Sequence, residues 1–522
     1  MTLVIAVASS PAQPKTFDQT TKNESPAMKA MAAQILAAVG SQASTFSPPM
    51  AAATYFMIGK TYESMDPAAS RRYFEQAYEV VRHLHDDQLF GLGYLQTEIV
   101  REMAIVAPRT VENELPQPLI QRNVVLETLV GDYIKEDKVE HAFELFRQME
   151  TEPEVDVAAR HLMTALTPKS TVNRASVFSI ALRIYRENVH PTITAGQPED
   201  LGSLTLRFWK DLPPPLVHEA IDELLKQADP QHAPEKSQVR SASMSATNRA
   251  GTVTFANEYE FRVFQLLPIL RKIDPPEAES LARDVTKLQI AFQKYPRGLA
   301  SLDPSVSDDA LTEDGRDVRY SIGSSNTVQA RATTSEINRS YDQIEADAVE
   351  HPNEALARAV AISDKPTRVR LLLNLAGDVY KTAPSTASSA LSRALDSAEE
   401  IHPGSLNWFL KAAELYLLMG KPEDAERALE DSSGVVLDLY AQDSNSDDPN
   451  LALKVYWPST LAWRDVIAEA SRISPDFAFK CVKAVPDDEI RAVEQVFLAG
   501  EMVNVHLSES TSPWVVHKAD LR

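Results

Sequence analysis

The chain of 522 residues is poor in cysteine and in basic residues, and each shortage excludes a class of protein. Its one cysteine, Cys481, excludes an intramolecular disulfide and a zinc site made only of cysteines. Basic residues number 52 against 74 acidic ones, which gives a formal charge of -22. A chain with this field repels phosphate backbones and contains no offsetting run of Lys and Arg, so we expect no nucleic-acid partner.

Long apolar runs are also absent, because no stretch approaches the roughly 20 residues of a transmembrane helix. The apolar residues Leu3 to Ala8 end in an Ala-x-Ala pattern and precede a polar segment, as in the back half of a secretory signal peptide. No Lys or Arg precedes them, so this remnant lacks a basic n-region. We expect a periplasmic or secreted protein exported from a bacterial cell, and a cytoplasmic location is the alternative.

Apolar residues recur mostly at intervals of three and four, as in Phe143, Phe146 and Met149, which is the pattern of amphipathic helices. Alternating apolar and polar runs, typical of strands, are nearly absent. Glycines number 16, and the 33 prolines stand mostly between the periodic segments. The sequence therefore predicts an all-α fold of many helices of about ten to twenty residues.

Two polar stretches interrupt the helical pattern and divide the chain. Both are rich in Ser and poor in apolar spacing, so we expect solvated or disordered linkers there. The predicted organisation is a signal-peptide remnant at 1–12, an N-terminal segment at 13–47, a first helical array at 48–234, a linker at 235–256, a helical hairpin at 257–296, a disordered linker at 297–335, a second helical array at 336–507 and a tail at 508–522.

Internal repeats are the most informative signal. In two segments, a tyrosine on one helix is followed nine residues later by a small residue on the next, as in Tyr133 and Ala142 or Tyr416 and Ala425. Two looser copies begin at Gly59 and Gly377, and Gly59 lies 34 residues before the next small residue of this kind, Gly93. A small residue lets two antiparallel helices approach closely, and the tyrosine fills the gap between them.

This pattern resembles the tetratricopeptide repeat, whose period is about 34 residues. The resemblance covers perhaps half of the chain, in two pieces, and departs from the family where Pro108, Pro116 and Pro118 interrupt the copy that begins at Gly93. The alternative is a generic array of helical hairpins. Either way the resemblance implies an α-solenoid whose first helices form a concave surface, on which such proteins bind a peptide or a partner protein.

On the matched copies, eleven positions would face this groove. They contain no paired Lys and Asn arrangement that could clamp a peptide carboxylate, which disfavours recognition of chaperone C-termini. The predicted partner-binding residues are Phe56, Lys60, Glu63, Glu127, Ile134, Asn374, Asp378, Lys381, Asn407, Leu410 and Glu414.

Candidate catalytic and metal-binding residues are few. His218 and Asp222, with Glu219 between them, are loosely similar to a zincin helix, but the second histidine is missing and a solvated helix face explains them more simply. The sequence has no Gly-x-Ser-x-Gly elbow and no phosphate loop. We therefore predict a noncatalytic scaffold without a metal or cofactor. An all-α hydrolase or lyase acting on a polymer, with carboxylates from separate helices, is the alternative.

Overall fold

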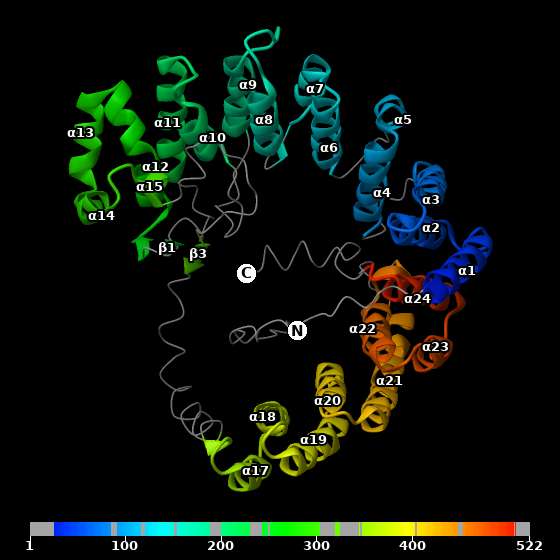
Figure 1. The fold of residues 1–522 in the computed structure, drawn as a ribbon. Helices are drawn as coiled ribbons and strands as arrows, with labels where there is room; N and C mark the ends of the chain where they lie inside the picture. The colour runs from blue at the N-terminus through cyan, green and yellow to red at the C-terminus, as the bar shows by residue number, and fades with distance from the viewer. Residues whose placement is uncertain are drawn as a thin grey trace.

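The protein is a curved array of paired helices, and the predicted all-α fold is confirmed (Figure 1). A computed structural model describes residues 26–84, 91–115, 121–150, 154–187, 200–229, 243–248, 251–302, 319–323, 344, 347–401, 405–446, 453–505 and 507. The predicted signal remnant and the predicted tail lie outside the described residues. No helix in the described ranges is both long and apolar enough to cross a membrane.

The first part of the chain contributes α1 (Pro26–Ala43), α2 (Pro48–Tyr62), α3 (Pro67–Val81), α4 (Leu92–Val106), α5 (Pro108–Asn113), α6 (Arg122–Lys135), α7 (Val139–Phe146), α8 (Glu154–Ala165), α9 (Arg174–Glu187), α10 (Leu201–Phe208), α11 (Pro214–Ala228), β1 (Ser243–Asn248), β2 (Gly251–Phe255), α12 (Glu258–Ile273), α13 (Pro275–Asp284), the 3-10 turn η1 (Thr286–Leu288), α14 (Gln289–Lys294) and α15 (Leu299–Leu302). The second part contributes β3 (Arg319–Gly323), α17 (Pro352–Val360), α18 (Lys365–Val379), α19 (Pro384–Glu399), α20 (Leu406–Leu418), α21 (Pro422–Ser444), the 3-10 turn η6 (Lys454–Tyr456), α22 (Pro458–Ile473), α23 (Pro475–Ala484) and α24 (Asp488–Met502).

Proline marks the start of many of these helices. It occupies the first turn of α2, α3, α11, α13 and α19, among others, where its missing N–H costs no hydrogen bond. Side chains cap further ends, as where Asp66 accepts from the N–H groups of Ala68 and Ala69. The prolines between periodic segments therefore set where helices begin.

The four segments predicted to be hairpins are the packed helix pairs α2/α3, α6/α7, α18/α19 and α20/α21. Two of them share the same turn, since Asp137 (φ 60°) and Gly420 (φ 70°) both adopt the left-handed conformation. After each turn a backbone N–H returns to the tyrosine carbonyl, from Lys138 to Tyr133 at 2.8 Å and from Lys421 to Tyr416 at 2.9 Å. This Schellman turn closes both hairpins in the same geometry.

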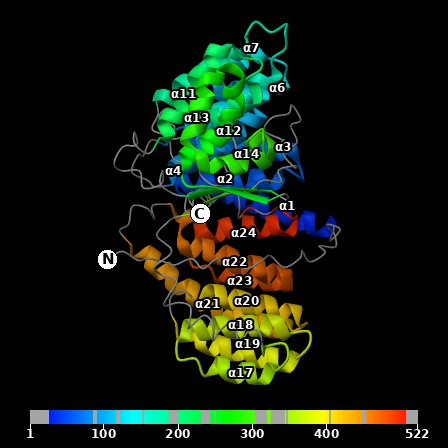
Figure 2. The same ribbon diagram turned by 90° about the vertical axis from the view of Figure 1, so that its left-hand side faces the viewer.

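Alternate helices form an inner and an outer row. The inner row runs without interruption through α18, α20, α22, α24, α2, α4, α6, α8, α10 and α12, each in contact with the next. In the outer row α1 pairs with α24, so one hairpin of the array is made from the first and last described helices of the chain (Figure 1). The side view shows α24 between α22 and α1 (Figure 2). Along the arc, the inner row therefore runs through the helices of the second array first and continues, from α24 to α2, into those of the first array.

A three-stranded sheet of order β2-β1-β3 replaces part of the predicted linkers. Met244 and Ala246 on β1 and Val253 and Phe255 on β2 are buried, and the Phe255 ring lies 5.3 Å from that of Phe264 on α12. The prediction of a structureless linker at 235–256 is therefore wrong for these residues. Apolar and polar residues alternate in both strands. In β1, however, the apolar positions are only Met244 and Ala246 between small polar residues, which is too weak an alternation to predict a strand.

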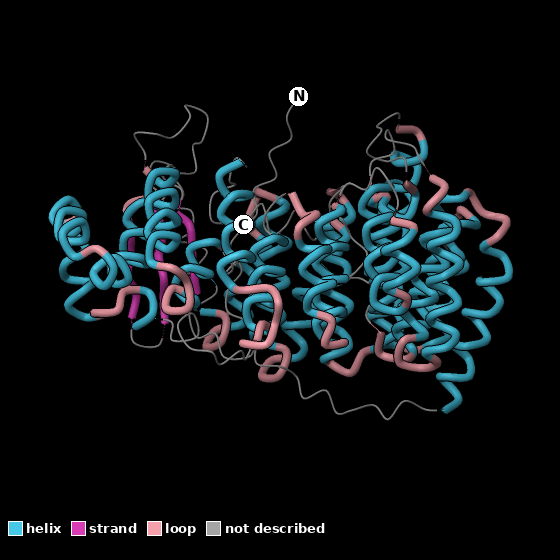
Figure 3. Tube along the Cα trace, turned by 90° about the horizontal axis from the view of Figure 1, so that it is seen from above, coloured by secondary structure: helices cyan, strands magenta, loops and turns pink. Residues whose placement is uncertain are grey.

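Two further segments also differ from the prediction. The segment 297–335 was predicted to be disordered, yet it contains α15 and β3, and β3 pairs with β1 because the sheet supplies backbone partners that the local sequence does not. The N-terminal segment 13–47 contains α1, whose buried residues Ala32, Leu36, Val39 and Ala43 follow a spacing of four and three. Seen from above, the helices lie side by side, with the strands near one end of the array (Figure 3).

Gly59 and Gly377 occupy the same repeat position but have different surroundings, which yields a test of the packing. A Cβ on Gly59 would lie 2.7 Å from the buried Phe74 ring, whereas a Cβ on Gly377 would meet only Leu415 at 3.8 Å. We expect Gly59→Ala to destabilise the protein by about 1 to 3 kcal/mol through overpacking. Gly377→Ala should stabilise it by up to about 1 kcal/mol because alanine favours helix. Denaturant melts measure both changes, and equal effects would contradict the close α2/α3 contact.

Candidate functional site

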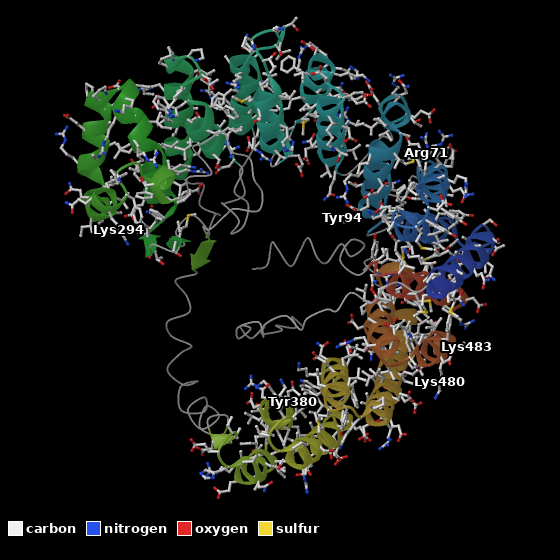
Figure 4. All side chains as sticks on the ribbon, in the orientation of Figure 1. Arg71, Tyr94, Lys294, Tyr380, Lys480 and Lys483 are labelled. Atoms are coloured by element: carbon white, nitrogen blue, oxygen red, sulfur yellow. The ribbon has the colours of Figure 1, made fainter. Side chains whose placement is uncertain are left out.

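The concave surface formed by the inner row is the candidate site. On α18 the residues Arg370, Asn374 and Asp378 are exposed at a spacing of four, while Leu371, Leu372 and their neighbours on the other faces are buried. The outer face of α18 is covered by α19, so the exposed stripe points to the inside of the arc. Tyr380, just after α18, lies at this inner edge (Figure 4).

The predicted groove residues on the second array lie on exposed or half-exposed faces of inner helices. Asn374, Asp378 and Lys381 are exposed, and the Lys381 ammonium lies 5.3 Å from the centre of the Tyr380 ring. On α20, Asn407 is exposed and Leu410 is half-buried. Glu414 is partly exposed, and its carboxylate accepts from Lys411 at 2.7 Å.

The predicted residues on the first array are placed less uniformly. Glu63 is exposed, and the Lys60 ammonium lies 2.8 Å from its carboxylate. Glu127 and Ile134 on α6 are half-buried. Phe56 is only 2% exposed, with its ring 5.9 Å from that of Phe74, so its prediction as an exposed groove residue is wrong. Phe56 therefore packs within its own hairpin, and α24 and η6 also contact α2 because it lies at the junction of the two arrays.

A small apolar hollow marks this junction in the middle of the inner row. Glu98 contributes the one carboxylate that lines the hollow. Burial raises the pKa of Glu98, although the Arg101 guanidinium, 2.6 Å away, acts to lower it. Glu98 is one helical turn after Tyr94, which lies at the inner edge of the arc (Figure 4). The hollow is lined by Ala53, Phe56, Met57, Leu95, Glu98, Val455 and Tyr456.

An ion network that the sequence did not predict borders the hollow. Lys60 on α2 bonds Glu102 on α4 at 3.2 Å, and Arg101 lies between Glu98 and Glu102, at 2.6 and 3.6 Å. The intervals from Glu98 to Arg101 and Glu102 are those of one helix face, but the prolines after Val106 obscured this copy of the repeat. The middle of the concave surface therefore combines an apolar floor with paired charges.

One charged group, Glu489, also links the two arrays. The Ser47 N–H, just before α2, donates to Glu489 on α24 at 2.6 Å, across 442 residues of sequence. The Lys454 ammonium lies 2.7 Å from Asp487 and 3.0 Å from Glu489. Partial burial acts to raise the pKa of Glu489, but the Ser47 N–H and the Lys454 ammonium together lower it by more, so the pKa lies below its usual value.

A buried ion pair lies deeper in the same junction. Arg464 on α22 and Glu494 on α24 are 3.2 Å apart and almost without exposure, and Arg464 also reaches the Val455 carbonyl at 3.4 Å and the Met57 sulfur at 4.0 Å. Burial raises the pKa of Glu494 to about 7, and Arg464 lowers it only in part.

Among the described residues, one group has the donor set of a metal site. His218 and Asp222 on α11 and Glu277 on α13 place ligand atoms within 4.8 Å of one another. Partial burial lowers the pKa of His218, but the hydrogen bond to Glu277 and the charge of Asp222 raise it to a value above the usual one. The sequence interpretation as a solvated helix face missed Glu277, because no local spacing links it to α11. These helices belong to the outer row, away from the concave surface.

Comparisons with known proteins assign no family to the chain. No family model and no curated protein matches it. One solved structure, titled "Circular tandem repeat protein with novel repeat topology and enhanced subunit contact surfaces", is similar at 12% identity over 94% of this chain and 99% of that one. Its TM-score of 0.15 is too low to support any argument about fold or function.

The buried Glu494 predicts a pH dependence of stability at the junction. Between its ordinary pKa of 4.5 and about 7, the folded protein holds a proton that the unfolded chain has lost, so the free energy of unfolding falls as the pH rises. Glu494→Gln should remove this decrease, on the order of 3 kcal/mol across the window. Denaturant melts from pH 4.5 to 8 measure the difference between the two proteins. Glu423→Gln, on an exposed site of α21, is the control, and identical slopes in wild type and Glu494→Gln would contradict the prediction.

Proposed function

We propose that the protein is a noncatalytic scaffold, similar to tetratricopeptide-like solenoids, that binds a protein or peptide partner on its concave surface. The observation that supports this most is the unbroken inner row, in which the hairpin of α1 and α24 joins two arrays into one curved surface. A partner can contact many helices of such a surface at once, which is how helical repeat proteins gain affinity. The apolar start of the sequence supports export as part of the proposal.

The chemistry of the surface favours a polar partner. Exposed amides at Asn374 and Asn407 can pair with a peptide backbone, and carboxylates such as Glu63 and Asp378 lie on the same inner helices. The hollow between α2, α4 and η6 offers one small apolar contact next to Glu98. Together these features suit an extended segment that makes backbone hydrogen bonds along the arc.

Photo-crosslinking tests the proposal. A photoreactive amino acid at 374 or 407, on the concave side, should capture one recurrent partner in the native cell, because these side chains face the groove. The matched convex positions are 71 and 483, whose residues Arg71 and Lys483 lie on the outer side (Figure 4). Capture of the same partner only from the convex positions would contradict the proposal.

Substitutions then measure the contribution of the groove. With the captured partner in hand, the double variant Asn374→Ala/Asn407→Ala should weaken binding about tenfold, or about 1.4 kcal/mol. Arg71→Ala serves as the convex control and should leave the dissociation constant unchanged. Titration calorimetry gives both values, and equal affinities for all three proteins would place the binding surface elsewhere.

A catalytic alternative is supported by one observation on the same surface. Burial raises the pKa of Glu469 on α22, Arg472 opposes this shift, and the charges of Glu414 and Asp465 raise the pKa further. A carboxyl group with a raised pKa is what a general acid requires, but here Arg472 donates to both Glu469 oxygens at 2.8 Å and would have to move for Glu469 to act. Turnover of a polymer that is lost in Glu469→Gln would favour this alternative over the scaffold.

A further inference from the structure

The outer row contains a side-chain cluster in which one imidazole meets three carboxylates. His218 Nε2 lies 2.6 Å from Glu277 Oε2 and 3.8 Å from Asp274 Oδ2. On the other side of the ring, His218 Nδ1 lies 3.0 Å from Asp222 Oδ2. The four side chains are 33 to 52% exposed, so water can also enter the cluster.

The local sequence fixes each of these groups. His218 and Asp222 are four residues apart and share one face of α11. Asp274 is the N-cap of α13, and it accepts from the Glu277 N–H at 3.1 Å, so the cap holds both carboxylates at the same helix end. Both α11 and α13 pack against α12, which sets the distance between them.

The surrounding charges do not compete for this cluster. Arg186 on α9 is the basic residue bonded to the same stretch of α11, and it pairs with Glu219 at 2.7 Å and Glu223 at 3.7 Å. Neither of these two carboxylates is within ion-pair distance of His218 in the described contacts. The cluster itself therefore keeps an excess of negative charge around one imidazole.

The two ring nitrogens have different surroundings, which is typical of a metal-ligating histidine. In such sites one nitrogen binds the metal, and the other donates its N–H to a carboxylate that orients the ring. Here Nε2 faces two carboxylates from another helix, and Nδ1 faces Asp222. One nitrogen and two carboxylate oxygens, with water completing the coordination, suit a divalent transition ion such as Zn²⁺ better than Mg²⁺ or Ca²⁺, which prefer oxygen alone.

We propose that His218 Nε2, Glu277 and Asp274 bind one Zn²⁺ ion per chain, with Asp222 orienting the imidazole. The ion replaces the proton that Nε2 shares with Glu277, and this proton is released to solvent. The ion joins α11 to α13 across α12 and stabilises the end of the array that carries the sheet. This role is structural and separate from the concave surface.

Calorimetry with Zn²⁺ alone tests the site on the full chain after treatment with a chelator. We expect one ion per chain, and no binding of Mg²⁺ at the same concentration. His218→Gln and Glu277→Gln should each weaken Zn²⁺ binding at least about tenfold. Asp274→Asn keeps a good N-cap while removing a ligand charge, so it should weaken binding without loss of helix.

The control is a second histidine with a single carboxylate partner. His141 Nε2 lies 2.9 Å from Glu112, and His141→Gln should leave Zn²⁺ affinity unchanged. Circular dichroism checks that every variant is folded, and visible absorption of Co²⁺ titrated into the protein reports coordination independently of heat. Absence of Zn²⁺ binding, or binding that persists in folded His218→Gln and Glu277→Gln, would overturn the proposal.

Discussion

The packing of α24 against α1 and α2 is the contact on which the whole architecture depends. Each array by itself would end in an uncovered helix face at this point, since α24 is buried by α22 on one side and by α1 and α2 on the other. Pairing the first and last described helices gives both arrays a neighbour and removes two exposed edges. The inner row, and with it the concave surface, is continuous only because this hairpin exists.

Polar groups at this junction determine the register of the contact. Apolar faces can slide, but the hydrogen bond from Ser47 to Glu489 favours one alignment of α24 against α2, and the buried pair of Arg464 and Glu494 fixes α24 against α22 within the second array. Removing one partner of the buried pair would leave a charge without compensation, which costs several kcal/mol. The same helices line the hollow, so the alignment of the arrays also shapes the middle of the candidate site.

The sequence predicted what is local and missed what is distant. Helix periodicity, prolines at helix starts and the repeated tyrosines identified four hairpins, because the residues of a hairpin contact each other within about forty positions. The α1/α24 hairpin joins positions more than four hundred residues apart, and no spacing rule connects them. The strands were missed because Met244 and Ala246 are weak signals, and β3 pairs with a strand more than seventy residues earlier.

The candidate site shows the same division. Asn374, Asp378 and Asn407 lie on exposed faces as the helical pattern predicts, since each hairpin there has ordinary neighbours. Phe56 follows the same pattern but is buried, because its ring packs against Phe74 on α3 and lies beside Val455 and Tyr456 of η6, from the far end of the chain. Glu277 was missed for the same reason, as its approach to His218 depends on how three helices pack.

The order of synthesis gives the closing hairpin a further consequence. A ribosome delivers α24 more than four hundred residues after α1, and at about 5 to 20 residues per second the interval between them is about 20 to 90 seconds. During that time the faces of α1 and α2 that pack on α24 have no cover, although the α2/α3 hairpin and those that follow it can already fold. Until α24 is made, the nascent chain therefore exposes an apolar helix edge, and a chaperone that shields this edge would be needed only until α24 leaves the ribosome.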